Sequence, residues 1–459
     1  MLEPSRLHKE MLQAVNSTAS AWTSPSDPAA FGPAPLSEQQ FGKLMAALGP
    51  FEQAPVLGVG VSGGADSTAL AILAHDWARE RGGRVHALIV DHGLRPESAG
   101  EAERVAAACA SRGMSADVLT WKGEIPVSGV EEAARATRHQ LLAKACRKHG
   151  LLHLLLAHHG DDQAETADMR QAMGSGPLGL AGMSACVERS HYRLLRPLLS
   201  ISRAQLEATL RARGIGWLDD PMNHDLSFAR ARLRRVGARP YDSASGQVRE
   251  AMEQELAEVL PGLVELDSFG RAQLDRIGWS RLPHPLALRV VSRIAQTVGG
   301  LDYPPRLRRM EALVSKLTAV GPLRATLGRC LWRGDERLAI TRERRNLPFM
   351  TECGGEEEVL WDGRFRLALP AGLWSVGPVT TTQWRDLAAQ SDQSALNGVK
   401  NPELGALPAV HDLEGVVAVP HLGYARNAHG MACRARFAPR QPLVPAKFVG
   451  TGAMDDDRR

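Results

Sequence analysis

The stretch VLGVGVSGGADSTAL, from Val56 to Leu70, contains the glycine and hydroxyl residues that typically bind phosphate, and it fits two motifs. In one frame, Gly58, Gly60 and Gly63 spell G-x-G-x-x-G, the dinucleotide fingerprint. In the other frame, Ser62 to Ser67 spell S-G-G-A-D-S, a different kind of phosphate loop. The frame decides whether the chain would hold a nicotinamide cofactor or split ATP.

Strand length separates the two frames. The first frame would end the strand at Gly58, only about three residues after Pro55, whereas the second lets it continue to Val61, the usual length of about five or six residues. Asp91, at the end of the next apolar run, could hold a ribose hydroxyl in the first frame. A Walker A loop is absent, because no G-K-[ST] stands at the required spacing. The sequence therefore favours the second frame.

Each residue type of this frame suits a triphosphate. Gly63 and Gly64 let the backbone approach phosphate oxygens and direct successive N–H groups toward an anion. Ser62 and Ser67 add hydroxyl donors, and the following helix, expected to begin at Asp66 or Ser67, offers its positive end. Asp66 would repel phosphate unless it holds a cation such as Mg²⁺; the alternative is a glycine-rich turn with Asp66 as the N-cap. The expected nucleotide-binding residues are Ser62, Gly63, Gly64, Ala65, Asp66 and Ser67.

A second candidate motif is AHHGDDQAET, from Ala157 to Thr166, directly after another apolar run. A helix that starts here would carry Asp161, Asp162 and Glu165 on its first turn, where residues three or four apart lie on one face. Such carboxylates can complete a metal site or hold an ammonium group. The alternative is a solvated first turn whose acids interact with the helix dipole.

The elements around these motifs predict how they are positioned. From about residue 39, short apolar runs such as VHALIV alternate with amphipathic stretches such as ESAGEAERVAAACASRG. This alternation indicates an α/β fold, a parallel sheet with helices on both faces. Ligands bind such sheets outside the carboxyl ends of the strands, where both motifs lie.

The rest of the chain divides by composition. We expect a disordered tail over 1–38, which is rich in Ser, Ala and Pro, and a catalytic domain over 39–240. Stretches such as HPLALRVVSRIAQTVG predict a helical, basic domain over 241–348. Short strand-like runs predict a small mixed or β-rich C-terminal domain over 349–459 with a frayed end.

Bulk composition excludes several classes. The six cysteines show no C-x-x-C spacing, which argues against a zinc ribbon, an iron–sulfur cluster or a disulfide framework and favours a reducing compartment. No apolar run is long enough to span a membrane and no secretory signal is visible, so a cytoplasmic location is expected. The formal net charge of +4 permits an anionic partner without requiring one. A homodimer is left open.

Taken together, the motifs resemble those of the bacterial tRNA(Ile)-lysidine synthetase family within the PP-loop ATP pyrophosphatases. Besides SGGADS and AHHGDDQAET, the similar segments are VDHGLRPESAGEAERV, VEEAARATRHQLL, MGSGPLGLAGM, RPLL and WLDDPMNHDLSFARARLRR. They occur in order over about 55–235, and TLGRCLWRGDERLAITRERR and WDGRFRL look like the family's later domains. Two positions depart from the family pattern: Met173 stands where Arg is usual, and Ala231 where Asn is usual.

The resemblance implies a two-step reaction. The C2 carbonyl oxygen of the wobble cytidine in tRNA(Ile) with anticodon CAU would attack the α-phosphate of ATP, and the ε-amine of free L-lysine would then displace AMP. It also implies Mg²⁺ on Asp66 with Asp161 or Asp162, and an amine-binding or proton-accepting carboxylate at Asp162 or Glu165. Arg135 would face developing negative charge or the base, and His92 would help to hold the nucleotide.

Basic residues late in the chain indicate a surface for the tRNA backbone. Five arginines and no acid lie between Phe228 and Arg239, and eleven basic against five acidic side chains lie between Asp302 and Arg345. Such contacts supply affinity without sequence information. A solvated helix face is the better explanation of any single arginine, whereas the set as a whole favours binding to the tRNA backbone. The expected RNA-binding residues are Arg230, Arg232, Arg234, Arg235, Arg306 and Arg309.

Two alternatives stay open. Another PP-loop enzyme that modifies tRNA, such as a thiolase, would commonly need paired cysteines that the chain lacks. A non-catalytic RNA-binding protein with a decayed nucleotide loop is the other, and the intact SGGADS and DDQAET motifs argue against it.

Overall fold

The computed structural model describes residues 22–23, 33–93, 97–121, 130–172, 177–189, 191–218, 243–354, 358–380, 383, 406–445 and 448–450. The chain divides into two compact units. The first comprises 1–251 and 446–459, and the second comprises 252–445. No helix in the described part of the chain is both long enough and apolar enough to cross a membrane.

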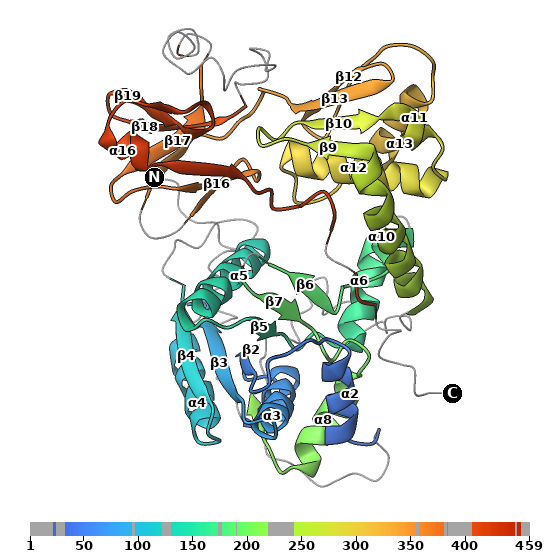
Figure 1. The fold of residues 1–459 in the computed structure, drawn as a ribbon. Helices are drawn as coiled ribbons and strands as arrows, with labels where there is room; N and C mark the ends of the chain where they lie inside the picture. The colour runs from blue at the N-terminus through green and yellow to red at the C-terminus, as the bar shows by residue number, and fades with distance from the viewer. Residues whose placement is uncertain are drawn as a thin grey trace, which may run out of the picture. The chain divides into compact units, whose positions relative to one another are not determined.

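The first unit is built on a six-stranded sheet with the strand order β4-β3-β2-β5-β7-β6 (Figure 1). Neighbouring strands are parallel except for β6, which pairs with β7 in the antiparallel direction. The strands are β2 (Val56–Gly60), β3 (Arg84–Asp91), β4 (Ser115–Thr120), β5 (His153–Leu155), β6 (Cys186–Glu188) and β7 (Arg193–Leu195). The predicted parallel α/β fold is confirmed.

Helices connect these strands and cover both faces of the sheet. Two-residue strands β1 (Trp22–Thr23) and β8 (Trp217–Leu218) pair separately. The helices are α2 (Glu38–Ala46), α3 (Ala65–Arg79), α4 (Ser98–Ala110), α5 (Val130–His149), α6 (Gly160–Ala172), α7 (Pro177–Leu180), α8 (Arg203–Ala212) and α10 (Ser243–Leu263), the last of which spans the boundary between the units.

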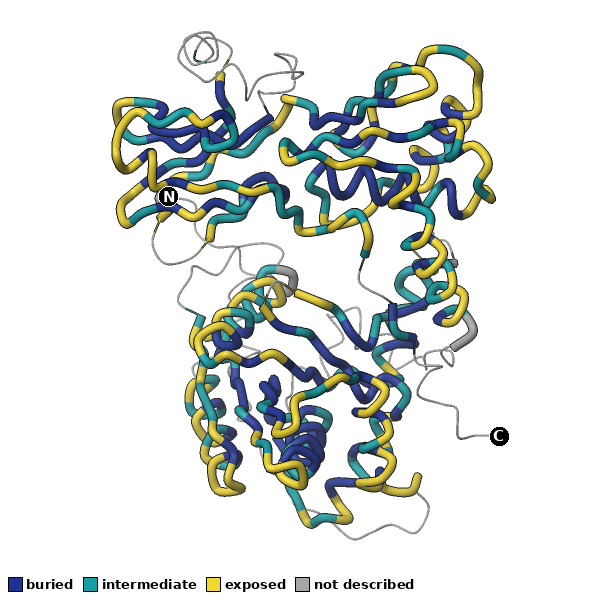
Figure 2. The backbone as a smooth tube through the Cα atoms, in the orientation of Figure 1, coloured by how far each residue is buried: buried dark blue, intermediate teal, exposed yellow. Residues whose placement is uncertain are grey.

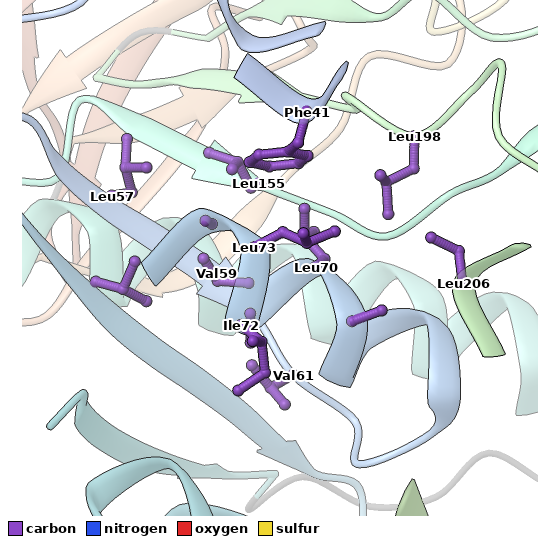
Figure 3. Packing of buried hydrophobic residues seen from close by; sticks show 14 of the residues in the cluster. Phe41, Leu57, Val59, Val61, Leu70, Ile72, Leu73, Leu155, Leu198 and Leu206 are labelled. Carbon is purple, nitrogen blue, oxygen red and sulfur yellow. The ribbon is translucent and has the colours of Figure 1, made fainter. Parts of the chain in front are cut away.

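Alternating side chains of the buried strands fill two separate cores. Leu155 packs with α2, α3, α4 and α8, whereas its neighbours Leu154 and Leu156 pack with α5 on the opposite face. This follows from the strand geometry, because successive side chains point to opposite faces. Figure 3 shows the first core, in which Leu70 and Leu73 of α3 lie near Phe41 of α2. The central strands and α3 are the most continuously buried parts of this unit (Figure 2).

Close packing around β2 explains why glycines occur at positions 58 and 60, where they match the dinucleotide motif by spacing. Gly58 and Gly60 lie inside β2, where Gly58 is in register with Leu154 of β5. A Cβ atom on Gly60 would lie 2.7 Å from Leu156 Cδ2, which is closer than side-chain carbons approach. The strand continues past Gly58 and ends at Gly60, one residue short of the predicted end, although the N–H of Val61 still donates to Leu88 O. The dinucleotide frame is therefore wrong.

The second unit contains helices and three antiparallel sheets, with strand orders β11-β12-β13-β10-β9, β14-β17-β18-β19-β20 and β15-β16-β21. Its helices are α11 (Arg276–Ser280), α12 (His284–Gly299), α13 (Leu307–Leu317), η3 (Pro420–Leu422) and α16 (Ala428–Ala432). Its first strands are β9 (Val264–Leu266), β10 (Ala272–Asp275), β11 (Leu323–Leu327), β12 (Cys330–Gly334), β13 (Arg337–Arg342), β14 (Met350–Cys353) and β15 (Val359–Trp361). The remaining strands are β16 (Phe365–Ala368), β17 (Trp374–Pro378), β18 (Pro408–Asp412), β19 (Gly415–Val419), β20 (Tyr424–Ala425) and β21 (Arg434–Phe437).

The region expected to be helical thus also holds a five-stranded sheet, against which α12 and α13 pack. Strands β12 and β13 hold only short apolar runs, Cys330 to Trp332 and Leu338 to Ile340, with arginines beside them, so neither shows a clear period of two in the sequence. The β-rich end of the chain is as expected. The domain boundaries drawn from the sequence remain a prediction.

Candidate active site

The loop between β2 and α3 has the geometry of an anion site. Gly63 adopts a φ of 88°, a conformation that residues with a Cβ rarely take. Gly64 is the N-cap of α3, and no side chain caps the helix there. The N–H groups of the first turn, which carry the positive end of the helix dipole, are thus left without a side-chain cap. An anion such as a phosphate group is suited to this position.

The two serines of the loop lie together. The hydroxyl oxygens of Ser62 and Ser67 are 3.1 Å apart, and the N–H of Ser62 donates to Ser67 Oγ at 3.1 Å. Ser67 Oγ in turn donates to Gly64 O. From the other side, Leu218 N–H donates to Gly63 O at 2.9 Å. The loop is therefore shaped by its own hydrogen bonds, with two hydroxyl groups beside the start of α3.

Asp66 lies in the first turn of α3, which begins at Ala65, and it is not the N-cap. Its Oδ1 is buried and has no hydrogen-bond partner among the residues that the structure describes. Its Oδ2 lies 3.5 Å from Nε2 of His159, a residue that precedes α6. A buried carboxylate oxygen without a partner is costly unless a cation is bound there.

His159 joins the two sequence motifs. This ring, 2% exposed, has Nε2 3.5 Å from Asp162 Oδ2 as well as from Asp66, and Nδ1 3.3 Å from Asp161 Oδ2. Burial would lower the pKa of His159, but hydrogen bonds to Asp161 and Asp66 and the charges of Asp162 and Asp66 raise it to about 10. The three predicted aspartates are thus brought together around one imidazolium.

The acids of α6 nonetheless have different surroundings. Asp161 is half exposed and accepts a 2.8 Å hydrogen bond from the N–H of Arg203; the hydrogen bond to His159, together with this one, lowers its pKa to about 2. Asp162 accepts from the N–H of His159 at 3.0 Å. Glu165 is only 1% exposed. The three side chains therefore do not form one solvated face, as the alternative interpretation required.

The residues present fit Mg²⁺. This ion usually takes only one or two carboxylates and completes its octahedron with water and substrate phosphates. Asp66, with its partnerless oxygen, and Asp162 approach the same ring nitrogen next to the start of α3. Asp161 contacts the other nitrogen of that ring, and its Oδ2 is engaged by Arg203.

Two other predicted residues, His92 and Arg135, lie in a strongly cationic region. His92 follows β3, and burial together with the charge of Arg138 lowers its pKa. Arg135 is exposed on α5, one turn before Arg138. Burial and the charges of Arg135, Arg138, Arg196 and Arg189 lower the pKa of His139 to about 4. Such a concentration of guanidinium groups attracts phosphate.

The carboxylate of Asp91, which the dinucleotide motif would need to bind a ribose, forms hydrogen bonds inside the protein instead. It is 6% exposed, and its Oδ1 accepts hydrogen bonds from the N–H of Gly93 at 2.9 Å and from Ser98 Oγ at 2.7 Å. The carboxylate thus organises the turn that leads into α4, which removes the second support for that reading.

Comparison with known proteins agrees with this geometry. Residues 34–238 match a family described as PP-loop domain. The chain is 39% identical over 305 residues to a tRNA(Ile)-lysidine synthase of Bradyrhizobium sp. strain BTAi1, covering 62% of this chain and 84% of that protein. A protein of the same name from Methylobacterium sp. strain 4-46 is 41% identical, and the match covers 62% of this chain and 88% of that protein. Another, from Ruegeria pomeroyi, is 33% identical, and the match covers 81% of this chain and 90% of that protein. The chain belongs to the tRNA(Ile)-lysidine synthase family.

Three residues at the site of this lysidine synthase family member carry no role predicted from the sequence. His159, Arg138 and Arg196 all lie inside the motifs AHHGDDQAET, VEEAARATRHQLL and RPLL. Arg196 is 8% exposed, donates from Nε to His158 Nδ1 at 3.2 Å and from a terminal nitrogen to Ser184 O at 2.8 Å. Their positions inside the motifs were a usable signal, but their contacts depend on segments far apart in sequence.

The arginines expected to bind RNA divide into two groups. Arg230, Arg232, Arg234 and Arg235 lie outside the described residues, as do the departures Met173 and Ala231. Arg306 and Arg309 are exposed at the start of α13 and line a cavity of about 820 Å³ together with Tyr303, Lys316 and Arg329. The second unit thus presents a basic groove with an exposed aromatic ring.

Proposed function

We propose that this chain ligates L-lysine to C2 of the wobble cytidine of tRNA(Ile) with anticodon CAU. The cytidine O2 attacks the α-phosphate of ATP and releases pyrophosphate. The lysine ε-amine then attacks C2, and the C2–O2 bond breaks so that the oxygen leaves with AMP. The chain is therefore a ligase that forms a carbon–nitrogen bond, and adenylation turns a poor leaving group into a good one.

ATP binds at the loop between β2 and α3 in this proposal. The observation that carries it is the start of α3 without a side-chain cap, directly beside the buried and partnerless Oδ1 of Asp66. Ser62 and Ser67 donate to phosphate oxygens, with the N–H groups of Gly63, Gly64 and Ala65. Bound Mg²⁺ would neutralise triphosphate charge, and Asp66 and Asp162 are the residues that would hold it. His92 borders the nucleotide.

Lysine requires a carboxylate for its ammonium group and a base for one proton. Glu165 is buried one turn after Asp161, and a buried carboxylate suits a bound ammonium group. We assign amine binding to Glu165 and leave proton removal to Asp162 or Glu165. Asp161 contacts Nδ1 of His159 and so keeps Nε2 of the same ring directed at Asp66 and Asp162.

The tRNA is held by cationic groups. Arg135, on the cationic face of α5, faces the charge that develops on the adenylated base. The groove lined by Arg306 and Arg309 binds backbone phosphates, and its exposed Tyr303 can stack on a base. We extend the same role to Arg230, Arg232, Arg234 and Arg235. A cytoplasmic location suits these substrates and the six buried free cysteines.

The deciding experiment measures AMP release from ATP with a CAU-anticodon tRNA(Ile) transcript, with and without lysine. AMP formation should depend on lysine, and a transcript with a GAU anticodon, which lacks the wobble cytidine, should give none. Release of AMP that needs a sulfur donor or glutamine instead of lysine would favour another PP-loop enzyme. Transcript binding without any ATP cleavage would favour a non-catalytic RNA-binding protein.

A further inference from the structure

Three metal-ligating side chains meet on the first unit outside the site described above. His86 belongs to β3 and Asp117 to β4, and His149 is the last residue of α5. Because His86 pairs with Ser115 and Leu88 with Asp117, the two strand residues are diagonal neighbours on one face. That face is covered by α5, whose end brings in the second histidine. His86 lies five residues before Asp91, roughly 16 Å along the strand from the nucleotide end of the sheet.

The donor atoms are close enough to share one ion. One ligand atom from each residue lies within 4.8 Å of the others. His149 Nε2 is 2.6 Å from Asp117 Oδ2, and His86 Nε2 is 3.5 Å from Asp117 Oδ1. A tetrahedral ion with bonds of about 2.0–2.1 Å needs ligand atoms roughly 3.4 Å apart, so small side-chain rotations suffice. The side chains are 14%, 27% and 24% exposed, which leaves a path for an ion and a position for water.

Hydrogen bonding alone does not account for the cluster. His86 Nε2 is buried, and its only polar contact among the described residues is a long one, 3.5 Å from Asp117 Oδ1, so a closer ligand could still be accommodated. The planes of the His86 and His149 rings are inclined by 38°, with centroids 4.2 Å apart. Within the described residues, Lys148 also approaches Asp117, with Nζ 3.7 Å from Oδ2, but its side chain is 70% exposed and can turn away into solvent.

We infer that His86, Asp117 and His149 form a binding site for a divalent transition metal ion of the zinc class. Two imidazoles and one carboxylate are a donor set that suits zinc, nickel or copper, whereas magnesium prefers oxygen ligands alone. The ion would join the C-terminal end of α5 to the β3–β4 edge of the sheet. It would thereby anchor the helix that carries Arg135 and Arg138, without taking part in the reaction.

The test is a calorimetric titration of the full chain with ZnCl₂ after treatment with EDTA, in buffer that contains Mg²⁺ and no nucleotide. One equivalent should bind with a Kd of about 1 µM or tighter, and the unfolding temperature should rise. His149→Gln and Asp117→Asn should each weaken binding by at least about tenfold, because each removes a ligand. Lys148→Met should bind at least as tightly as the wild type.

Two further variants separate this site from others. His191→Gln, at an exposed position of the same unit, and Asp66→Asn should both leave zinc binding unchanged. The inference is overturned if the wild-type chain takes up no zinc, if the ligand variants bind as the wild type does, or if Asp66→Asn alone abolishes binding. Circular dichroism checks folding, and either ligand variant suffices if the other does not fold.

Discussion

The first turn of α3 combines two electrostatic features with opposite effects on a bound phosphate. The helix end attracts an anion, and Asp66 brings a negative charge to the same turn. Asp66 Oδ1 is buried without a hydrogen-bond partner in the described part of the chain, and Oδ2 faces His159. A carboxylate in this position is useful only if a cation comes with the phosphate, which is why we place Mg²⁺ there.

Asp66→Asn should reduce the rate of AMP formation by about 100-fold or more, because a neutral amide holds Mg²⁺ much more weakly than a carboxylate and the triphosphate charge is then left without its cation. Binding of tRNA should stay within a few-fold of wild type, since the phosphate contacts of the tRNA lie elsewhere. Single-turnover kinetics and filter binding measure the two effects. Glu80→Gln, at the exposed C-terminal end of the same helix, is the control. Normal turnover by Asp66→Asn would show that the metal assignment is wrong.

Gly63→Ala should destabilise the first unit by about 1–3 kcal/mol and also impair ATP binding. The new Cβ would lie 2.7 Å from Val105 and 2.8 Å from Leu218, at a φ of 88°. Gly82→Ala is matched, because it has a φ of 70° but open space around the new atom, so it should cost only about 1 kcal/mol. Urea denaturation compares them, and equal losses would mean that packing at Gly63 contributes nothing.

At the scale of elements, α13 presents arginines on more than one face. Arg306 and Arg309 line the groove, whereas Arg308 is exposed on the same helix but does not line it. Arg306→Gln with Arg309→Gln should weaken tRNA binding and lower its salt slope by roughly one per lost contact. Arg308→Gln should change neither quantity. Filter binding over a range of salt concentrations checks this, and equal effects of all three would indicate only a general change in charge.

The short helix η3 between β19 and β20 should make the second unit sensitive to acid. Burial, assisted by the charge of Arg364, lowers the pKa of His421 to about 4, and its ring packs edge-on against Phe365. The unfolded chain therefore takes up a proton near pH 6.5 that the folded chain accepts only near pH 4. Stability is complete above this window and falls as the pH drops through it, by at most about 3 kcal/mol.

Urea denaturation at several pH values measures this loss. His421→Gln should flatten the dependence between pH 6.5 and 4 relative to the wild type, because glutamine does not titrate. His429→Gln, at an exposed position in the same sheet region, should leave the dependence unchanged. An unaltered slope in His421→Gln would show that other groups cause the acid sensitivity.

At the scale of the whole molecule, the chain returns to its first unit at its end. Phe448 is 3% exposed, and the guanidinium carbon of Arg249 lies over its ring, 4.2 Å from the ring centroid. Val449 O accepts from the N–H of Ala185 at 2.9 Å, and Val449 N–H donates to Ser184 Oγ. Residues 446–459 thus belong to the first unit, although the second unit separates them from it in sequence.

Phe448→Ala should therefore destabilise the first unit by about 3–5 kcal/mol, the usual cost of removing a buried ring. Hydrogen exchange should become faster around residues 184–186, while amides of α12 in the second unit keep their protection. Leu413→Ala, at a fully exposed position, should change neither region. Faster exchange in α12 as well would show that the two units unfold together.

The sequence by itself determined the α/β class, the nucleotide loop and the family, because these depend on local order. Alternating apolar runs set strands and helices, and S-G-G-A-D-S is contiguous, so its chemistry can be read without the fold. It even separated the two glycine frames from strand length alone. It did not predict the sheet of the second unit, because the short apolar runs of β12 and β13, flanked by arginines, show no clear alternation.

Only the tertiary structure decided which side chains from distant segments come into contact. His159 meets Asp66 because parallel strands β2 and β5 end at the same edge of the sheet, which brings together residues far apart in the sequence. Packing of α5 on the face of β3 likewise brings His149 to His86, and contacts with Arg249 hold Phe448 in the first unit. Burial and pairing depend on these long-range neighbours, so whether an acid is solvated or faces an imidazole is set by packing and not by its place in a motif.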